Sequence, residues 1–429
     1  MTAASLSELD KRSGELGAYL EAHAPYVAER AFVSDRVALE RDHPQLCRWL
    51  IARSTAALQA YEDDPQRLGV EAPAPLRDWI TAAHALCDLP RIDPIDERLP
   101  AQLLWGVPGR KRAQIAAFAA ATRSLIGDPS APIVDWCAGK GHLARLLQRH
   151  YGYATTCIEA QQHLCEAGES LDRRARATSQ WVNTDVHQAG AHEHLRGGVA
   201  VALHACGELH RELASRGVEN GAQAILIAPC CYHRESHHGQ RGPTDRHLAW
   251  SPERPGVRPA PPPFIYRPMS ASVAAQALQI DENALRLATS AEVVASPRVV
   301  QRREQEQLFR LALDSLVRRA TGDDAYLSLP PFPKHWLDGD FAAFVDAVAE
   351  AMGISLASAD IDDVLEQARG RLHRVRALGL VRGVFRRPLE IWLALDAGLF
   401  LESGGYQVQL ASFCPRQVTP RNILIVARI

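Results

Sequence analysis

Residues 133–147, with the sequence IVDWCAGKGHLARLL, decide the expected fold. The stretch begins with apolar residues up to Asp135, continues through a turn that contains Gly139 and Gly141, and then enters a helical pattern over 142–150. A buried strand, a glycine turn and a helix in this order begin a ligand-binding α/β unit. Glycine is favoured in such a turn because it adopts left-handed backbone angles and lets a ligand approach the main chain.

The flanking sequence extends this unit into a sheet. A helical pattern over 110–125 comes first, and strands are predicted at 132–135, 154–158, 179–183, 199–203 and 224–228, with helical stretches such as 209–216 between them. Two more strands, 406–413 and 422–427, end the chain as a β-hairpin. Strands that alternate with helices predict a parallel sheet with both faces covered. We therefore expect an α/β protein with a Rossmann-like sheet of seven strands.

The chain is long enough for several packed units. Residues 1–100 show helical spacing, end in a proline-rich linker over 88–100, and predict a helical accessory domain. The core of the sheet is expected over 101–233, a loop followed by a helical insertion over 234–400, and the completing hairpin over 401–429. Residues 234–268 of this loop are rich in proline, arginine and histidine.

Composition excludes several classes of protein. Of 429 residues, 47% are hydrophobic and 23% are charged, which is typical of a globular chain. No apolar run reaches the ~18 residues that span a bilayer, and the first residues lack the apolar segment of a signal peptide, so we predict a cytoplasmic protein without membrane contact. Nine scattered cysteines without a CxxC pair predict free thiols and no disulfide-linked partner. A net charge of −2 excludes a uniformly basic protein.

Two cofactors fit the glycine turn. The pattern Gly139-x-Gly141-x-x-Ala144, with Glu159 further on, also matches a dinucleotide-binding site. However, Asp135 would place a carboxylate near the two phosphate charges of such a cofactor. S-adenosylmethionine has no phosphate and carries an ammonium and a sulfonium, so an acid suits it. The sequence therefore favours S-adenosylmethionine, bound at Asp135, Ala138, Gly139 and Gly141.

Two further acids strengthen this prediction. Glu159 ends the second predicted strand, where its carboxylate can accept both ribose hydroxyls, and Asp185 follows the third, where it can accept from the adenine amino group. The carboxyl ends of successive parallel strands meet at one edge of a sheet. We therefore expect Asp135, Glu159 and Asp185 to line one crevice.

At this point the sequence resembles a known family. The stretches VDWCAGKGHLARLL, VALHACGELH, ILIAPCCYH and VTPRN are similar to a class I methyltransferase family that includes the glutathione S-transferase C-terminal domain-containing protein and related methyltransferase-like proteins. A eukaryotic tRNA 2'-O-methyltransferase is a more distant relative, although its N-terminal zinc-finger signature is absent here. The resemblance covers about 105–233 and the hairpin. It implies a class I methyltransferase sheet and S-adenosylmethionine as the cofactor, and it leaves the acceptor open.

Candidate reactive residues follow the fourth and fifth predicted strands. They are His204, Cys206, Cys230, Cys231 and His233. A histidine can orient the acceptor and remove its proton, so we predict His204 and His233 as catalytic residues, with Cys206 and Cys230 beside them. The alternatives are buried cysteines that only pack, a nucleophilic Cys230, and a zinc site made from Cys206, Cys230, Cys231, His233, His237 and His238. The spacing matches no usual zinc motif, and we predict no metal.

A cationic stretch suggests the partner. Residues 369–387 contain seven arginines and no acid, and the 234–268 loop adds arginines together with Trp250, Phe264 and Tyr266. Basic charge with aromatic side chains suits RNA, so Arg371, Arg374 and Arg376 are predicted to bind it. The alternative is a helical surface whose arginines pair with acids such as Asp360, Asp362 and Asp363.

These observations predict an S-adenosylmethionine-dependent methyltransferase that acts on RNA, either tRNA or rRNA. The alternative enzyme methylates a protein or a small molecule. A third possibility is a non-catalytic scaffold that only binds S-adenosylmethionine. The oligomeric state is not determined by the sequence.

Overall fold

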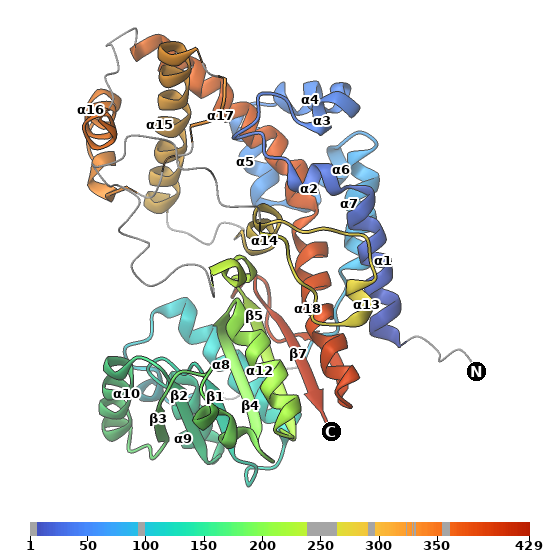
Figure 1. The fold of residues 1–429 in the computed structure, drawn as a ribbon, viewed down its shortest axis with the longest axis vertical. Coiled ribbons are helices and arrows are strands. Elements are labelled where there is room, and N and C mark those ends of the chain that lie inside the picture. The colour runs from blue at the N-terminus through green and yellow to red at the C-terminus, as the bar shows by residue number, and fades with distance from the viewer. Residues whose placement is uncertain are drawn as a thin grey trace.

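A computed structural model of the chain describes residues 7–92, 99–237, 264–290, 297–322, 324–327, 329, 332–353 and 361–429. Its centre is a seven-stranded sheet of order β3-β2-β1-β4-β5-β7-β6 (Figure 1). The strands are β1 (Ile133–Trp136), β2 (Thr155–Glu159), β3 (Gln180–Asn183), β4 (Val199–Cys206), β5 (Ala224–Cys230), β6 (Gln407–Ser412) and β7 (Ile423–Arg428). Strands β1 to β5 are parallel, and β7 runs antiparallel to β5 and β6. The predicted α/β class and the seven-stranded Rossmann-like sheet are confirmed.

Alternate residues of the central strands enter two separate apolar clusters, one on each face of the sheet. Val199, Val201 and Leu226 pack with α8 (Gly109–Ile126) and α9 (His142–Tyr151). Their neighbours Ala200 and Ile225 face the other way. That second face packs against α12 (Glu208–Glu219) and α18 (Arg386–Ser403). Because both faces are covered, the strands are apolar along their whole length, which is why the sequence pattern located them.

The N-terminal part of the chain is helical. Its elements are α1 (Glu8–Ala22), α2 (Ala24–Ala28), α3 (Ala38–Asp42), α4 (Pro44–Ile51), α5 (Thr55–Asp63), α6 (Pro65–Glu71) and α7 (Leu76–Leu86). Helix α1 packs along α18, so these helices share one apolar cluster with the sheet (Figure 1).

The second helical part follows the sheet strands in the chain. It contains α13 (Ala271–Ala274), α14 (Glu282–Thr289), α15 (Pro297–Thr321), α16 (Phe341–Met352) and α17 (Ile361–Val384). Helices α15 and α16 form their own apolar cluster with the start of α17, around Leu313, Phe344 and Val348, on the side of the molecule away from the sheet (Figure 1). Connecting elements are η1 (Ala101–Leu104), α10 (Gln162–Ala175), α11 (Ala189–His192), η2 (Glu193–Leu195), η3 (Tyr232–His237) and η4 (Lys334–Leu337).

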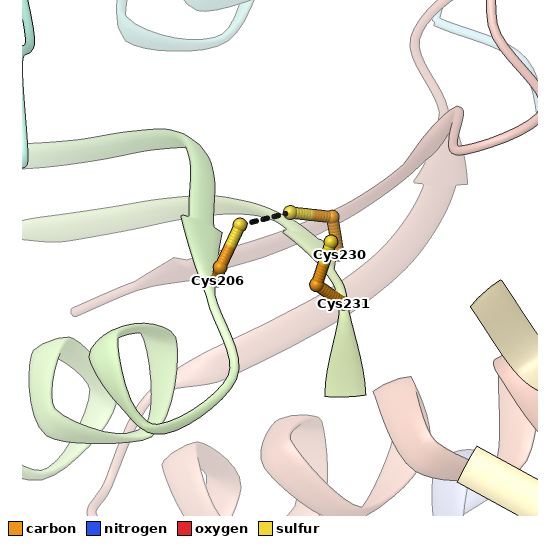
Figure 2. Close-up of side chains that lie close together, drawn as sticks. All are labelled: Cys206, Cys230 and Cys231. Atoms are coloured by element: carbon orange, nitrogen blue, oxygen red, sulfur yellow. Dashed lines mark hydrogen bonds between the residues drawn. The ribbon is translucent and has the colours of Figure 1, made fainter. Parts of the chain in front are cut away.

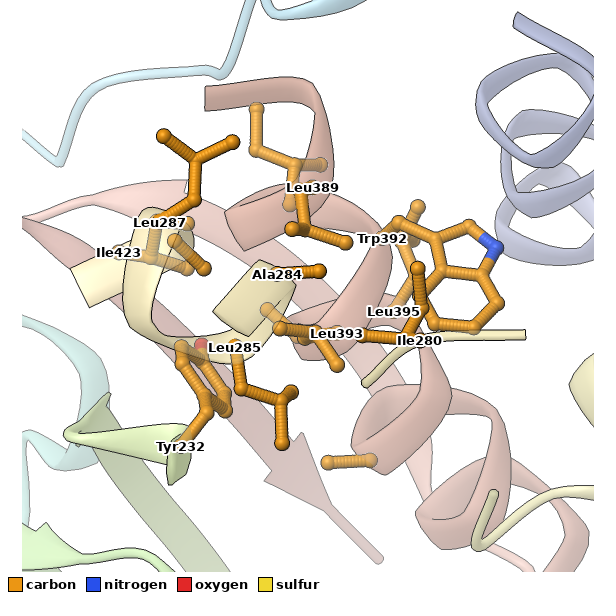
Figure 3. Close-up of a cluster of buried hydrophobic side chains, with 14 of the residues drawn as sticks. Tyr232, Ile280, Ala284, Leu285, Leu287, Leu389, Trp392, Leu393, Leu395 and Ile423 are labelled. Carbon is orange, nitrogen blue, oxygen red and sulfur yellow. The ribbon is translucent and has the colours of Figure 1, made fainter. Parts of the chain in front are cut away.

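Helix α18 connects the helical parts to the sheet. Leu389, Trp392 and Leu393 of α18 pack against Leu285 of α14, and Tyr232 at the end of β5 closes the cluster (Figure 3). Since α18 lies on the sheet, we propose to count it with the sheet domain, whereas the sequence pattern placed residues up to 400 in the insertion. None of the helices in the described ranges is long and apolar enough to span a membrane.

A buried carboxyl group fixes the chain where it returns to the sheet domain. Asp396 of α18 is fully buried and accepts hydrogen bonds from the Tyr266 hydroxyl at 2.6 Å and from the backbone N–H groups of Met269 and Ser270 at 2.7 and 2.8 Å. The Ser270 hydroxyl donates a fourth bond at 2.7 Å. Phe264 and Tyr266, two of the aromatic residues considered for RNA, pack in this core instead, and Trp250 lies outside the described residues.

We expect Asp396→Ala to lower the free energy of unfolding by at least about 3 kcal/mol, because it leaves several buried donors without an acceptor. Chemical denaturation measures this. The control is Asp338→Ala, which removes a mostly exposed carboxylate paired with Arg302 and should change stability by less than about 1 kcal/mol. Equal losses in the two variants would contradict a structural role for the Asp396 hydrogen bonds.

Candidate active site

The turn after β1 has the strained backbone expected of a ligand-binding loop. Cys137, Gly139 and Gly141 have φ values of 60°, 59° and 63°. The N–H of Ala138 donates to the Ile158 carbonyl of β2 at 3.0 Å, which ties the turn to the neighbouring strand. No described atom lies within 4 Å of the position that a Cβ on Gly139 would take. The main chain at Gly139 is therefore open to a ligand, as the sequence predicts.

Gly141 is required for a second reason. A Cβ there would lie 2.7 Å from the ring of Trp181, and a Cβ on Gly168 of α10 would lie 2.1 Å from the same ring. Contacts this short do not occur between real side chains. The indole therefore occupies space that only two glycines can leave, and it holds the turn, α10 and β3 at a fixed spacing.

A buried ion pair supports this packing. The Arg145 guanidinium of α9 lies 2.8 Å from Asp172 of α10, and both side chains are almost completely buried. Asp172 also accepts a hydrogen bond from the Trp181 indole at 2.9 Å, and Arg145 donates to the Lys140 carbonyl of the turn at 3.0 Å. Sequence reasoning missed these three positioning residues. The available signal was a charged residue, Arg145, within the apolar stretch HLARLL.

Asp135 lies beneath the start of α9. Its carboxyl is 4% exposed and accepts the Ala144 N–H at 3.2 Å. Burial raises its pKa to about 7, against a lowering by the Ala144 hydrogen bond, and the charge of Glu159 raises it further. A cationic group bound nearby would reverse that shift, because it would stabilise the ionised form.

Glu159 and Asp185 also lie at the predicted edge of the sheet. Glu159 is 7% exposed, and its two oxygens accept the N–H groups of Gly139 and Gln161, each at 2.9 Å. Asp185 is exposed, lies just past β3, and accepts the His187 N–H at 3.0 Å. Burial raises the pKa of the Cys137 thiol, and the nearby charges of Glu159, Asp135 and Asp185 contribute in the same direction.

His204 lines a cavity at the end of β4. The register of β4 against β5 shifts between Leu203 and Cys206, and His204 has a left-handed φ of 72°. The cavity has a volume of about 450 Å³ and is lined by Pro108, Gly109, Arg110, Lys111, Gln114, His204, Val418, Thr419 and Pro420. Burial lowers the pKa of His204 to about 4, and the positive charges of Lys111 and Arg421 lower it further. The imidazole is therefore neutral at pH 7.

His233 lies elsewhere and is not among the residues that line this cavity. It belongs to η3, and its Nδ1 lies 3.1 Å from the Thr289 hydroxyl of α14. Burial lowers its pKa as well, with a further contribution from Arg286. Of the two predicted histidines, the structure places only His204 in the cavity.

The cysteines predicted beside the histidines form a compact group (Figure 2). Cys206 and Cys230 are paired across β4 and β5, with 3.2 Å between their sulfurs, and all three sulfurs, including that of Cys231, lie within 4.8 Å of one another. Thiol donation from Cys206 and Cys230 lowers the pKa of Cys231, while the same contacts raise the pKa of Cys230. Cys230 is 2% exposed, so burial and a raised pKa both disfavour it as a nucleophile.

The group is incomplete as a zinc site. Among the described residues, the only group of His, Cys, Asp or Glu side chains close enough together to hold one metal ion is these three cysteines. Structural zinc usually has four protein ligands. His233 is not part of the group. The side chain of His237 and the whole of His238 lie outside the described residues. All nine cysteines of the chain are described, and all are free, as predicted.

The three arginines predicted to bind RNA form ion pairs inside the protein. The pairs are Arg371–Asp314 at 2.7 Å, Arg374–Glu40 at 2.5 Å and Arg376–Glu62 at 2.8 Å. Their side chains are no more than 25% exposed. Helix α17 is thus tied to the N-terminal helices and to α15, and contact of these arginines with a phosphate would require the pairs to break.

The sequence suggested Asp360, Asp362 and Asp363 as partners of these arginines, and the structure pairs the arginines with other acids. Asp363 pairs with Arg319 of α15 at 2.7 Å, and Asp360 lies outside the described residues. The partners of the three arginines come instead from α3, α5 and α15, far away in the sequence. The three arginines therefore pair with acids elsewhere in the chain, as the alternative prediction held, and none of their described ion-pair partners is Asp362 or Asp363.

The comparison with known families agrees with this geometry. Residues 110–237 match the family model described as a methyltransferase domain. This part of the chain is therefore similar to a methyltransferase domain. The matched segment contains β1 to β5, the glycine turn, the three acids and His204. With the observed strand order, it establishes an S-adenosylmethionine-dependent methyltransferase with S-adenosylmethionine as cofactor.

Two solved structures are similar in part. A crystal structure of a mutant of MtNAS shares 11% identity over 52% of this chain and 83% of that chain, with a TM-score of 0.23. Coclaurine N-methyltransferase bound to N-methylheliamine and SAH shares 13% identity over 50% of this chain and 62% of that chain, also with a TM-score of 0.23. No protein with a curated description matches. The strand order, rather than these similarities, establishes the fold.

The raised pKa of Asp135 predicts pH-dependent binding of S-adenosylmethionine. The ammonium of the cofactor favours the ionised carboxylate, so binding releases a proton below pH 7, and affinity should rise with pH from 6 to 7 by up to about tenfold. Calorimetry in buffers of different ionisation enthalpy measures both effects. Asp135→Asn keeps the hydrogen-bond acceptor and should bind more weakly and without this pH dependence. The same pH slope in both proteins would show that Asp135 does not interact with the ammonium.

The cysteine group should matter for stability and little for turnover. Cys230→Ser should lower the free energy of unfolding by about 1–3 kcal/mol, because it buries a hydroxyl in place of a thiol. Cys47→Ser, a change at a buried cysteine of the N-terminal helices, is the matched control. If Cys230→Ser were inactive, and the wild-type protein formed a covalent adduct with RNA that contains a C5-fluorinated pyrimidine, Cys230 would be a nucleophile instead. Stoichiometric zinc that is lost in Cys230→Ser and Cys231→Ser would establish a metal site.

Proposed function

We propose that this chain methylates RNA in the cavity beside His204. The observation that carries the proposal is the make-up of this cavity, which lies at the end of β4 and combines a neutral histidine with Arg110 and Lys111. No acid is among its lining residues. Such a cavity favours an anionic or electron-rich acceptor. The patterns Leu-His-x-Cys-Gly over 203–207 and Cys-Cys-x-His over 230–233 resemble those of a tRNA 2'-O-methyltransferase, which supports RNA as that acceptor.

The residues around the glycine turn fit the cofactor. Gly139 leaves open space above its main chain, and the three acids near the turn suit a cofactor that carries an ammonium and several hydrogen-bond donors. We assign Asp135 to the ammonium, Glu159 to the ribose hydroxyls and Asp185 to the adenine amino group. When bound, S-adenosylmethionine supplies a methyl carbon activated by a positive sulfur.

His204 then acts on the acceptor. A neutral imidazole accepts a hydrogen bond from the attacking hydroxyl or amine and so orients it towards the methyl carbon. As the new bond to carbon forms and the carbon–sulfur bond breaks, the acceptor proton passes to His204. A pKa of about 4 makes the imidazolium short-lived, so the proton continues to water. Lys111 and Arg421 favour this release because their charges repel the imidazolium.

A small-molecule acceptor is the second candidate. The cavity volume of about 450 Å³ lies in the range typical of small-molecule sites. We also propose a cytoplasmic location, which the nine free cysteines support because reduced thiols are usual there. Mass spectrometry of RNA and small molecules from cells with and without this gene would separate the two acceptors.

Removal of the imidazole should slow methyl transfer. We expect His204→Ala to reduce the rate of methyl transfer from S-adenosylmethionine to the RNA acceptor by about 100-fold. The affinity for the cofactor should not change. The wild-type rate should be level from pH 6 to 8 and fall below about pH 5, as the base becomes protonated. Transfer of a radioactive methyl group measures both.

His233→Ala is the matched control, since it removes an imidazole outside the cavity and should retain most of the activity. Full activity of His204→Ala would remove the histidine from the mechanism. Tight cofactor binding without transfer to any acceptor in a cell extract would favour a non-catalytic scaffold.

A further inference from the structure

The start of α8 has an unusual charge pattern. Its first turn contains Arg110, Lys111 and Arg112 and no acid, and Pro108 at the N-cap supplies no side-chain cap. The N-terminus of a helix is its positive end, and its first N–H groups have no partner within the helix. Three cations at this end repel the helix dipole. An anion bound there would offset that repulsion and accept hydrogen bonds from the free N–H groups.

A second observation on the same helix points to a ligand. Gln114 is 7% exposed, lines the same cavity, and its Nε2 has no hydrogen-bond partner among the described residues. An amide nitrogen buried without an acceptor destabilises a protein. A ligand oxygen in the cavity would satisfy it.

The cations of the cavity are available to such a ligand. Within the described ranges, neither Arg110 nor Lys111 forms an ion pair, and both are exposed. Lys111 lies close enough to His204 for its charge to act on the imidazole. The helix terminus, the amide and the histidine therefore surround one space.

We propose that this cavity contains a subsite for a phosphate group of the methyl acceptor, bound by the first turn of α8, Lys111 and the Nε2 of Gln114. Phosphate fits better than a carboxylate, because its several oxygens can meet donors that come from a helix end, an ammonium and an amide at once. The inference rests on the proposed function in one respect, namely that the acceptor enters the cavity of His204. It places the phosphate beside the atom to be methylated.

The test is a titration of the whole chain with inorganic phosphate at constant ionic strength, in which calorimetry measures the binding. Lys111→Met should weaken binding by about tenfold and Gln114→Leu by about threefold to tenfold, as expected for one charged and one neutral hydrogen bond. Lys11→Met, which removes an exposed lysine of α1, is the matched control and should leave binding unchanged. Gln114→Leu should not lower the melting temperature, since it removes an unpartnered amide; this separates a binding role from a structural one.

Competition identifies the source of the phosphate. A single-stranded oligoribonucleotide that displaces phosphate from the wild type, but binds Lys111→Met weakly, would assign the subsite to a nucleic-acid backbone. Displacement by uridine monophosphate alone would assign it to a small phosphorylated acceptor. Either result supports the subsite. Absence of phosphate binding at millimolar concentration, or equal weakening by Lys11→Met, would overturn it.

The subsite and the proposed function can fail separately. Lys111-dependent phosphate binding in a protein that transfers no methyl group to RNA would retain the subsite and refute the proposed function. RNA methylation that depends on His204 but is unaffected in KM by Lys111→Met and Gln114→Leu would retain the function and overturn the subsite.

Discussion

The cofactor site depends on the packing of one indole ring against two glycines. Trp181 fills the space left by the absent side chains of Gly141 and Gly168, and the ion pair of Arg145 with Asp172 holds the ring in place. A buried ion pair contributes little net stability, because desolvation offsets the attraction, but it permits few geometries. Here the geometry matters, since it sets the turn on which the bound methyl donor would lie.

The helical parts support the acceptor side of the sheet. Helix α14 packs against η3, just after the end of β5. It also packs against α18, which lies on the sheet (Figure 3). The cavity itself lies between the start of α8, the end of β4 and the loop before β7. The edge at which we propose that the cofactor binds is therefore built by β1 to β3, whereas the cavity that we propose for the acceptor uses elements from distant parts of the chain. Such a separation would allow the methyl donor and the acceptor to be bound by different parts of the protein.

The sequence located the parallel strands to within a few residues, because strands covered on both faces are short apolar runs with clear ends. It also located Asp135, Glu159 and His204, since residues that follow parallel strands gather at one edge. It could not show what the arginines of α17 contact. Two of their partners, Glu40 and Glu62, lie more than 300 residues away, and such pairing depends on the tertiary fold. Gln114 was missed because a polar residue on a helix gives no sign of burial. The charge of Arg145 within the apolar stretch HLARLL was a sign of burial, but it did not show which residues the side chain contacts.

Four residues other than glycine adopt left-handed backbone angles in the described part of the chain, and three of them stand at the ends of central strands: Cys137, His204 and Cys231. Each conformation costs about 1–2 kcal/mol for such a residue. At His204, heat resistance and the proposed activity therefore favour different residues. A population selected only for survival at high temperature would accumulate glycine at all three positions, and its stabler descendants would lack the imidazole that lines the cavity.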